Sequence, residues 1–233
     1  MSTPTVFLVD DDKATHLRIS KLMNTVNLPT NSYYYAQDFL ENYQQQPCCL
    51  LLDIYMPEMT GLELYEQLLA KNISLPVIFL TSHTDVPAEL RIRKANMFDF
   101  LEKQVNNLIL LKRVQQAIKF DICSRQEEAE RQKWLDRFKT LTPREHEVMG
   151  QLLVGKSNKA TAIALGIHYK TVENYHTQIM KKMQTSNTVQ LVHVAFFCGL
   201  LPPSKELIFD SSHSKVPAIN LNRGEHVGSP VSF

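Results

Sequence analysis

The sequence predicts a five-stranded parallel α/β domain followed by an all-helical domain. Short apolar runs alternate with helical patterns over residues 1–120, which is typical of a parallel sheet covered by helices on both faces. Residues 139–202 show helical patterns alone. The charge also divides, since residues 1–125 hold 12 basic and 14 acidic side chains, whereas residues 139–202 hold 7 basic and 3 acidic. The second domain is therefore suited to a polyanion.

Each element of the first domain is expected from a local pattern. Apolar runs predict strands at 6–9, 32–35, 49–53, 76–81 and 97–101. Apolar residues at helical spacing predict helices near 14–23, 37–45, 62–69 and 86–95, and a further helix from about residue 105. Five β/α units result.

The remaining boundaries follow from polarity. The helical pattern continues to residue 138 and becomes charged at 124–132, which predicts a helical linker over 121–138 between domains at 1–120 and 139–202. Trp134, Leu135 and Phe138 are expected to dock the linker onto the second domain. Residues 203–233 are rich in Ser, Pro, Asn and Gly, which is typical of a disordered tail.

The composition, with 44% hydrophobic and 21% charged residues, fits a soluble globular protein. No apolar stretch approaches the roughly 18 residues of a membrane span, and residues 1–12 lack a signal-peptide pattern. We therefore expect a cytoplasmic protein with no membrane partner. The four cysteines lack CxxC spacing and are expected to stay reduced.

Acidic residues follow two of the expected strands. Asp10 and Asp11 come directly after the first strand, and Asp53 closes the apolar run CLLLD, ahead of Pro57 and Gly61. A carboxylate that ends a buried strand needs a cation or a basic partner to stay ionised. Because the carboxyl ends of parallel strands meet at one edge, these acids are expected to form an oxygen-ligand pocket suited to Mg²⁺. Asp53 would then be a nucleophile or a metal ligand.

Two further residues are expected at the same edge, because Thr81 ends the fourth strand and Lys103 follows the fifth. They would bind the oxygens of a phosphoryl group on Asp53. Each residue also has an ordinary explanation. Residues 10–12 could cap the next helix, Thr81 could be a turn residue, and Lys103 could be solvated. The coincidence of the strand ends favours the site.

The second domain contains a helix-turn-helix pattern. Thr142, Pro143 and Glu145 form the start of a helix with a capping box. Helices at 158–165 and 169–183 are separated by a turn at Gly166. The second of these is expected to bury Val172, Ile179 and Met183 and to present, on its other face, Lys170, Glu173, Asn174, Thr177, Lys181 and Lys182. Such a face suits the DNA major groove, although a generic amphipathic helix pair would give a similar pattern.

Residues 5–120 resemble the receiver domains of two-component response regulators, which have a flavodoxin-like fold. The resemblance rests on the acid pair Asp10–Asp11, on Asp53, on Thr81 and on Lys103. It implies that Asp53 is the phosphoacceptor and that Asp10, Asp11, Asp53 and the carbonyl of Tyr55 bind Mg²⁺. It also implies that Thr81 and Lys103 sense the phosphate and that Phe100 is the switch aromatic. TSHTDVP at 81–87 resembles the nitrogen-fixation subgroup. Gln104 departs from the family's Lys-Pro, so a trans bond is expected after Lys103.

The words LTPRE, GKSNK, LGI, KTVE and IMKKM are similar to the LuxR-type DNA-binding domain of quorum-sensing regulators. This resemblance implies that Glu173, Asn174 and Thr177 face bases. It also implies phosphate contacts for Lys156, Asn158, Lys170, Thr171 and Lys181. His168 stands where a capping Ser is usual, and Tyr175–His176 replaces a His-Arg pair. The loss of the Arg would weaken the affinity for the DNA backbone or make it depend on pH through His176. The apolar helix at 191–200 would support dimerisation or simply pack in the core.

Together the resemblances imply a transcriptional regulator rather than an enzyme. A sensor histidine kinase would phosphorylate Asp53 with Mg²⁺, and a homodimer formed on phosphorylation would bind double-stranded DNA. Two alternatives stay open. The receiver could act without phosphorylation, as the change at Gln104 suggests, or the acidic site could belong to a Mg²⁺-dependent phosphohydrolase.

Overall fold

The computed structural model describes residues 3–82 and 97–200. These divide into two compact units, of which the first ends at Arg125 and the second begins at Gln126. The helix expected at 86–95 and the tail expected at 203–233 lie outside the described residues.

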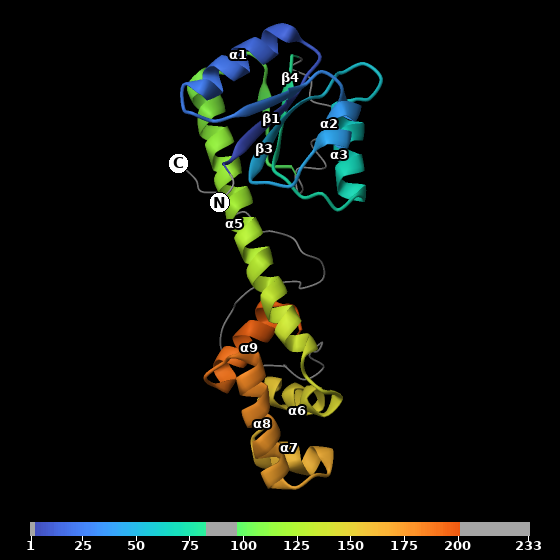
Figure 1. The fold of residues 1–233 in the computed structure, drawn as a ribbon, viewed down its shortest axis with the longest axis vertical. Helices are drawn as coiled ribbons and strands as arrows, with labels where there is room; N and C mark the ends of the chain where they lie inside the picture. The colour runs from blue at the N-terminus through green and yellow to red at the C-terminus, as the bar shows by residue number, and fades with distance from the viewer. Residues whose placement is uncertain (1–2, 83–96, 201–233) are drawn as a thin grey trace, which may run out of the picture. The chain divides into compact units, whose positions relative to one another are not determined.

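The first unit contains one five-stranded parallel sheet (Figure 1). Its strands are β1 (Thr5–Val9), β2 (Thr30–Tyr33), β3 (Cys48–Asp53), β4 (Val77–Thr81) and β5 (Asp99–Glu102), in the order β2-β1-β3-β4-β5. In this register Val9 is paired with Leu52, Asp53 with Leu80, and Thr81 with Glu102. The carboxyl ends of β1, β3, β4 and β5 therefore meet at one edge, as the sequence predicts.

Two strands differ from their predicted bounds. β2 begins two residues earlier than expected and ends at Tyr33, because Val6 pairs with Thr30 and the Asp10 N–H donates to the Tyr33 carbonyl. The β-propensity of three successive tyrosines misplaced the prediction toward Tyr35. β5 begins at Asp99, two residues later than expected. Strand pairing, which local propensity does not record, sets both bounds.

Helices cover both faces of the sheet, in line with the fully buried central strands β1, β3 and β4 (Figure 1). On one face α2 (Ala36–Asn42) and α3 (Gly61–Ala70) pack through Phe39 and Leu64 onto strand residues that include Phe7 and Phe79. On the other face α1 (Lys13–Asn24) and α5 (Asn107–Lys139) bury Ile19 and Val114.

A buried carboxylate fastens α5 to the amino end of the central strand. Asp121, only 3% exposed, accepts a 2.8 Å hydrogen bond from the backbone N–H of Cys48, the first residue of β3. Its Oδ2 atom also lies 2.7 Å from Nε of Arg125. Burial lowers the pKa of Arg125, but the hydrogen bond and charge of Asp121, together with those of Tyr43, outweigh burial and raise it. The ion pair thus satisfies both a buried charge and a strand N–H.

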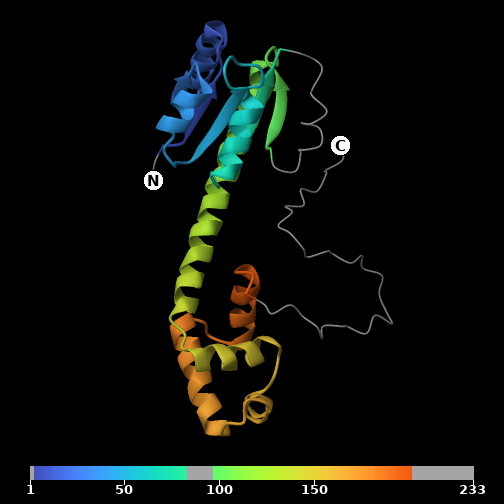
Figure 2. The ribbon, with the colours of Figure 1, turned by 90° about the vertical axis from the view of Figure 1, so that its right-hand side faces the viewer.

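The second unit is helical, with α6 (Pro143–Leu153), α7 (Asn158–Leu165), α8 (Tyr169–Met183) and α9 (Thr188–Phe197) around one core (Figure 2). Trp134, Leu135 and Phe138, from the end of α5, pack against this core as predicted. The predicted capping box of Thr142 and Glu145 is present at the start of α6. α7 ends at Gly166, whose φ of 63° is left-handed and suits glycine.

α9 begins three residues earlier than the sequence predicts. Asn187 is its N-cap and accepts a hydrogen bond from the Gln190 N–H. The helix ends at Phe197, and Gly199 follows with a φ of 67°. The apolar pattern at 191–200 misplaced the element because Thr188, Val189 and Gln190, which precede the pattern, form the first turn after the Asn187 cap. Cys48, Cys49 and Cys198 are buried, and Cys123 is exposed; none of these four described cysteines is in a disulfide.

The Asp121 anchor leads to the first prediction. Asp121→Ala should lower the free energy of unfolding of the first unit by about 3 kcal/mol, because it leaves Arg125 and the Cys48 N–H without their acceptor. Trp134, the one tryptophan of the chain, lies in the second unit. Urea denaturation followed by circular dichroism should show the loss, whereas the Trp134 fluorescence transition should move little.

The matched control is Asp136→Ala, which removes a carboxylate from an exposed pair with Lys139 on the same helix. It should leave both transitions in place, since exposed ion pairs contribute little. Equal effects of the two substitutions would contradict the anchoring role.

Candidate functional site

Three carboxylates converge at the carboxyl edge of the sheet. One oxygen from each of Asp10, Asp11 and Asp53 lies within 4.8 Å of the others. Asp10 and Asp53 are buried, and Asp11 is exposed. The N–H of Asp12 donates to Asp10 Oδ1 at 2.9 Å, and the N–H of Tyr55 donates to Asp53 Oδ1 at 3.4 Å. The structure therefore brings the predicted acids together.

The capping alternative holds for the third aspartate alone. Asp12 is the N-cap of α1, where its side chain accepts from the N–H groups of Ala14 and Thr15. The bond from Ala14, and then the bond from the Thr15 hydroxyl, lowers its pKa. Asp10 and Asp11 have no part in this cap. The run of three acids thus divides between helix capping and the cluster.

Lys103 bridges the two buried acids. Its Nζ atom lies 2.8 Å from Oδ2 of Asp10 and 2.8 Å from Oδ2 of Asp53. Burial lowers the pKa of this ammonium group, but the bonds to Asp10 and Asp53 outweigh burial and raise it. For Asp10, burial raises the pKa despite the bonds from Lys103 and Asp12. Lys103 is therefore a fixed cation between two acids, and the solvated alternative is wrong.

The other predicted residues lie around this triad. Thr81 ends β4, is 1% exposed, and accepts the Lys103 N–H on its carbonyl at 2.7 Å. Phe100 lies on β5, half-buried against the cluster of α2 and α3. Tyr55 follows Asp53 and exposes its side chain, which leaves its backbone beside the acids. Peptide bonds in the described residues are all trans, so the bond after Lys103 is trans as expected.

A glycine after β3 shapes the site. The Gly61 N–H donates to the Ile54 carbonyl at 2.9 Å, and a Cβ at this position would lie 2.0 Å from the Asp53 carbonyl oxygen. Thr60 and Glu63 form a capping box that starts α3 at this glycine. The sequence marks Gly61 by its place in the DIYMPEMTG string but offers no reason for it. The reason is a close backbone approach, which only the fold reveals.

The donor set fits Mg²⁺. All three side chains offer oxygen, the ligand atom that this cation prefers. Burial raises the pKa of Asp10 despite the bonds from Lys103 and the Asp12 N–H, so keeping this carboxylate ionised has a free-energy cost. A divalent cation beside these acids would relieve that cost. The same arrangement places Asp53 and Lys103 where a phosphoryl group could be received and its charge matched.

In the second unit, α8 has the two faces that the sequence predicts. Val172, Ile179 and Met183 are fully buried in the core. On the opposite face Asn174 and Thr177 are exposed, in line with major-groove contact. The other residues predicted to contact DNA differ in their exposure. The exposed ones are Lys156, Lys170 and Lys181, and the half-buried ones are Asn158, Thr171 and Glu173.

Lys182 does not belong to the polar face. Its Nζ lies 2.6 Å from Oε2 of Glu145 and 3.2 Å from the carbonyl of Thr140. Burial raises the pKa of Glu145, but the bonds from Lys182 and Thr142 outweigh it and lower the pKa. The sequence placed Lys182 next to Lys181 on the basic face. The structure assigns it to the α6–α8 packing instead.

Two histidines that depart from the family pattern have defined roles. His168 is the N-cap of α8, where its Nδ1 accepts from the Lys170 N–H at 3.2 Å, so it replaces a capping hydroxyl. His176 is half-buried, with Nδ1 3.1 Å from Asn158 Oδ1 and Nε2 3.3 Å from the Thr188 hydroxyl. It therefore joins α7, α8 and α9.

Two family models match the chain, one in each unit. Residues 6–115 match the response regulator receiver domain, and residues 139–195 match the luxR family of bacterial regulatory proteins. The chain belongs to the response regulators that join a receiver domain to a LuxR-type DNA-binding domain, a family of transcriptional regulators. This confirms the predicted family and the flavodoxin-like fold of the first unit.

Among its relatives is the transcriptional regulatory protein TdiR of Thauera aromatica, 34% identical over 190 residues, with 81% of this chain and 84% of TdiR covered. FixJ of Bradyrhizobium diazoefficiens is 31% identical over 197 residues, covering 84% and 96%. The solved structure of the response regulator StyR has a TM-score of 0.73 at 34% identity, covering 84% of this chain and 99% of StyR. Full-length FixJ from B. japonicum has a TM-score of 0.51 at 30% identity, covering 87% and 100%.

Within residues 3–82 and 97–200, no helix combines the length and the apolar character that crossing a membrane requires.

The close approach at Gly61 predicts a contrast between two glycines. Gly61→Ala should lower the free energy of unfolding by about 2–3 kcal/mol, since the methyl group must displace the backbone of Asp53. Gly150→Ala, within α6, should raise it by up to about 1 kcal/mol, because a Cβ there meets no atom within 4 Å. Urea denaturation followed by circular dichroism measures both. A tolerated alanine at position 61 would contradict the geometry.

Proposed function

We propose that this regulator is switched by phosphorylation of Asp53. The observation that carries the proposal is the buried triad in which Lys103 bonds both Asp10 and Asp53 at 2.8 Å. Asp53 attacks the phosphorus of a phosphohistidine on a sensor histidine kinase, so that a P–N bond breaks and an acyl phosphate forms. Lys103 supplies the positive charge beside the arriving phosphoryl oxygens.

Asp10, Asp11, Asp53 and the backbone carbonyl of Tyr55 would hold a Mg²⁺ ion. When bound, this cation neutralises charge on the phosphoryl group during transfer. Asp10 is the ligand for which the metal matters most, because it is fully buried and its pKa is raised by burial. Lys103 donates a hydrogen bond to Oδ2 of Asp53, and the other oxygen, Oδ1, accepts from the Tyr55 N–H.

The phosphate would be sensed by two groups at the same edge of the sheet. The hydroxyl of Thr81 and the ammonium of Lys103 would bind its oxygens. Phe100 would respond, because it is half-buried on β5 two residues from Glu102, the partner of Thr81 in the sheet. A change at Thr81 thereby reaches the surface of the receiver.

The output would be the binding of double-stranded DNA by α8. Glu173, Asn174 and Thr177 would face base edges, and the phosphate contacts would come from Lys156, Asn158, Lys170, Thr171 and Lys181. Exposure of Lys170 and Lys181 beside Asn174 supports this assignment. Lys170 also lies 2.9 Å from Glu173, which pre-orients that carboxylate.

We further propose that phosphorylation produces a homodimer. α9 buries Leu191 and Val194 in the core but leaves Val189 80% exposed and Phe196 61% exposed. One side of the helix therefore packs within the unit, and the other side offers apolar surface to a second copy. Such a pairing would match two half-sites on DNA.

The acceptor is tested by incubating the full-length protein with Mg²⁺ and acetyl phosphate. Intact-mass spectrometry should show one phosphoryl group on the wild type, none on Asp53→Asn, and none after chelation of Mg²⁺. Asp12→Asn is the matched control, because asparagine caps α1 equally well. It should accept one group.

Two outcomes would favour the alternatives. Continuous release of phosphate beyond one equivalent would indicate a phosphohydrolase. Normal dimerisation and DNA binding by Asp53→Asn, measured by sedimentation and fluorescence anisotropy, would indicate a receiver that acts without phosphorylation.

The DNA-binding face predicts different effects for two neighbouring residues. Lys181→Ala should weaken binding to all sequences and reduce the slope of log affinity against log salt by about one. Asn174→Ala should cost about 1–3 kcal/mol on the preferred site and little on random DNA. Fluorescence anisotropy over a salt series measures both, with Lys71→Ala as a control that removes the same charge from the first unit. Identical behaviour of the two variants would contradict the assignment.

A further inference from the structure

The backbone of Lys103 is held on its amino side by the sheet. Lys103 and Gln104 occupy the middle of a turn that the Val105 N–H closes by donating to the Glu102 carbonyl at 2.9 Å. The Lys103 N–H donates to the Thr81 carbonyl. The Lys103 carbonyl points out of this turn, where the sheet gives it no partner.

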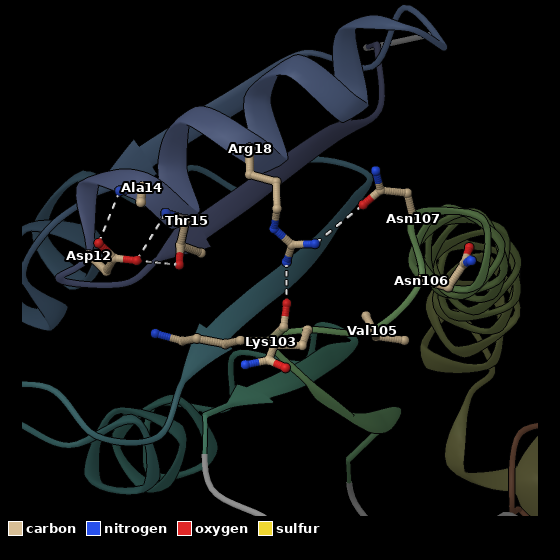
Figure 3. A pocket seen from close by; sticks show the side chains of 9 residues that line it. Asp12, Ala14, Thr15, Arg18, Lys103, Val105, Asn106 and Asn107 are labelled. Atoms are coloured by element: carbon tan, nitrogen blue, oxygen red, sulfur yellow. Dashed lines mark hydrogen bonds between the residues drawn. The ribbon is translucent and has the colours of Figure 1, made fainter.

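Arg18 of α1 supplies that partner. Its Nη2 donates to the Lys103 carbonyl at 2.6 Å, and its Nη1 donates to Oδ1 of Asn107, the first residue of α5, at 3.3 Å. Figure 3 shows the guanidinium crossing from α1 to both groups. The planar fork of arginine is pre-organised for two such acceptors, and charged donors form strong hydrogen bonds.

Val105 packs against the apolar core on this face of the sheet, and the rest of the turn borders an open space toward α1. A pocket of about 520 Å³ separates the start of α1 from the turn (Figure 3). Apart from Arg18 its walls come from Asp12, Ala14, Thr15, Lys103, Gln104, Val105, Asn106 and Asn107. Because the space is not filled by apolar side chains, the Arg18 bonds provide the cross-link between α1 and the turn within the described residues. Gln104, unlike a proline, does not stiffen the turn.

We propose that Arg18 is a positioning residue for phosphoryl transfer. By holding the Lys103 carbonyl, it fixes the start of the side chain whose ammonium group must reach Asp10 and Asp53 together. This inference rests on the proposed phosphorylation of Asp53. A lysine that must satisfy two acceptors at 2.8 Å tolerates little displacement of its backbone, and small misplacements of catalytic groups lower rates steeply.

The test compares full-length Arg18→Ala with Arg113→Ala, which removes the same side chain from an ion pair with Asp99 elsewhere in the first unit. Phosphorylation by acetyl phosphate is measured over a Mg²⁺ series. Arg18→Ala should lower the rate at saturating Mg²⁺ and acetyl phosphate by on the order of tenfold, the equivalent of one hydrogen bond to a charged donor. Arg113→Ala should retain the wild-type rate.

Two further readouts separate positioning from loss of structure. The Mg²⁺ concentration for half-maximal rate should stay unchanged in Arg18→Ala, because the carboxylates are not displaced. Arg18→Lys, which keeps one charged donor for the Lys103 carbonyl, should recover most of the rate. The thermal midpoint from circular dichroism identifies a variant that merely unfolds.

A wild-type rate in Arg18→Ala would overturn the inference. So would a loss of rate accompanied by an equal change in Mg²⁺ dependence and no recovery with lysine. If the wild type, Arg113→Ala and Arg18→Ala all fail to accept a phosphoryl group, the proposed function itself is wrong. The two failures are therefore distinguishable.

Discussion

The receiver unit depends on one ammonium group held between two buried carboxylates. Asp10 and Asp53 come from β1 and β3, which are neighbours in the sheet, so their charges oppose each other at close range. The Lys103 ammonium group offsets the repulsion between these two carboxylates. Lys103 directly follows β5, which is two strands away from β3 in the sheet. Strands lie about 4.8 Å apart, so the side chain must extend past the end of β4. Lysine is long enough for this path.

The surroundings of this triad all fix its parts. Asp12 caps α1 directly after Asp10, so the chain leaves β1 in a defined direction. Gly61 lets the turn after β3 close against the Asp53 carbonyl. Arg18 and Thr81 hold the backbone of Lys103 from two sides. Two buried acids and one ammonium group so close together respond to any charge added beside them, because opposite and like charges at short range act strongly on one another.

The second unit shows how departures from a family pattern are accommodated. His168 caps α8 through a ring nitrogen in place of a hydroxyl. His176 joins Asn158 of α7 to Thr188 of α9 and so contributes to packing in place of an arginine at the surface. With Lys182 paired to Glu145, the basic surface of α8 is smaller than the sequence suggests. Lys170 and Lys181 remain exposed on this helix.

The sequence by itself determined the class of each unit and nearly all members of the acidic site. Continuous apolar strands, the acids at their ends, the capping box at Thr142 and the spacing of Val172, Ile179 and Met183 are local patterns, and local patterns record which face of an element is buried. The sequence did not predict the correct bounds of β2, β5 and α9, because strand pairing and helix caps set these bounds.

The tertiary structure alone decided which charges meet. The sequence does not show that Lys103 bridges Asp10 and Asp53, that Asp121 bonds the start of β3, or that Lys182 turns from the polar face toward Glu145. These partners are 37 to 93 residues apart in the chain. The sequence did not predict the role of Arg18, because an arginine on an amphipathic helix is ordinarily expected to point into solvent. Hydrogen bonds between distant residues depend on how the elements pack, and packing is not written in any local pattern.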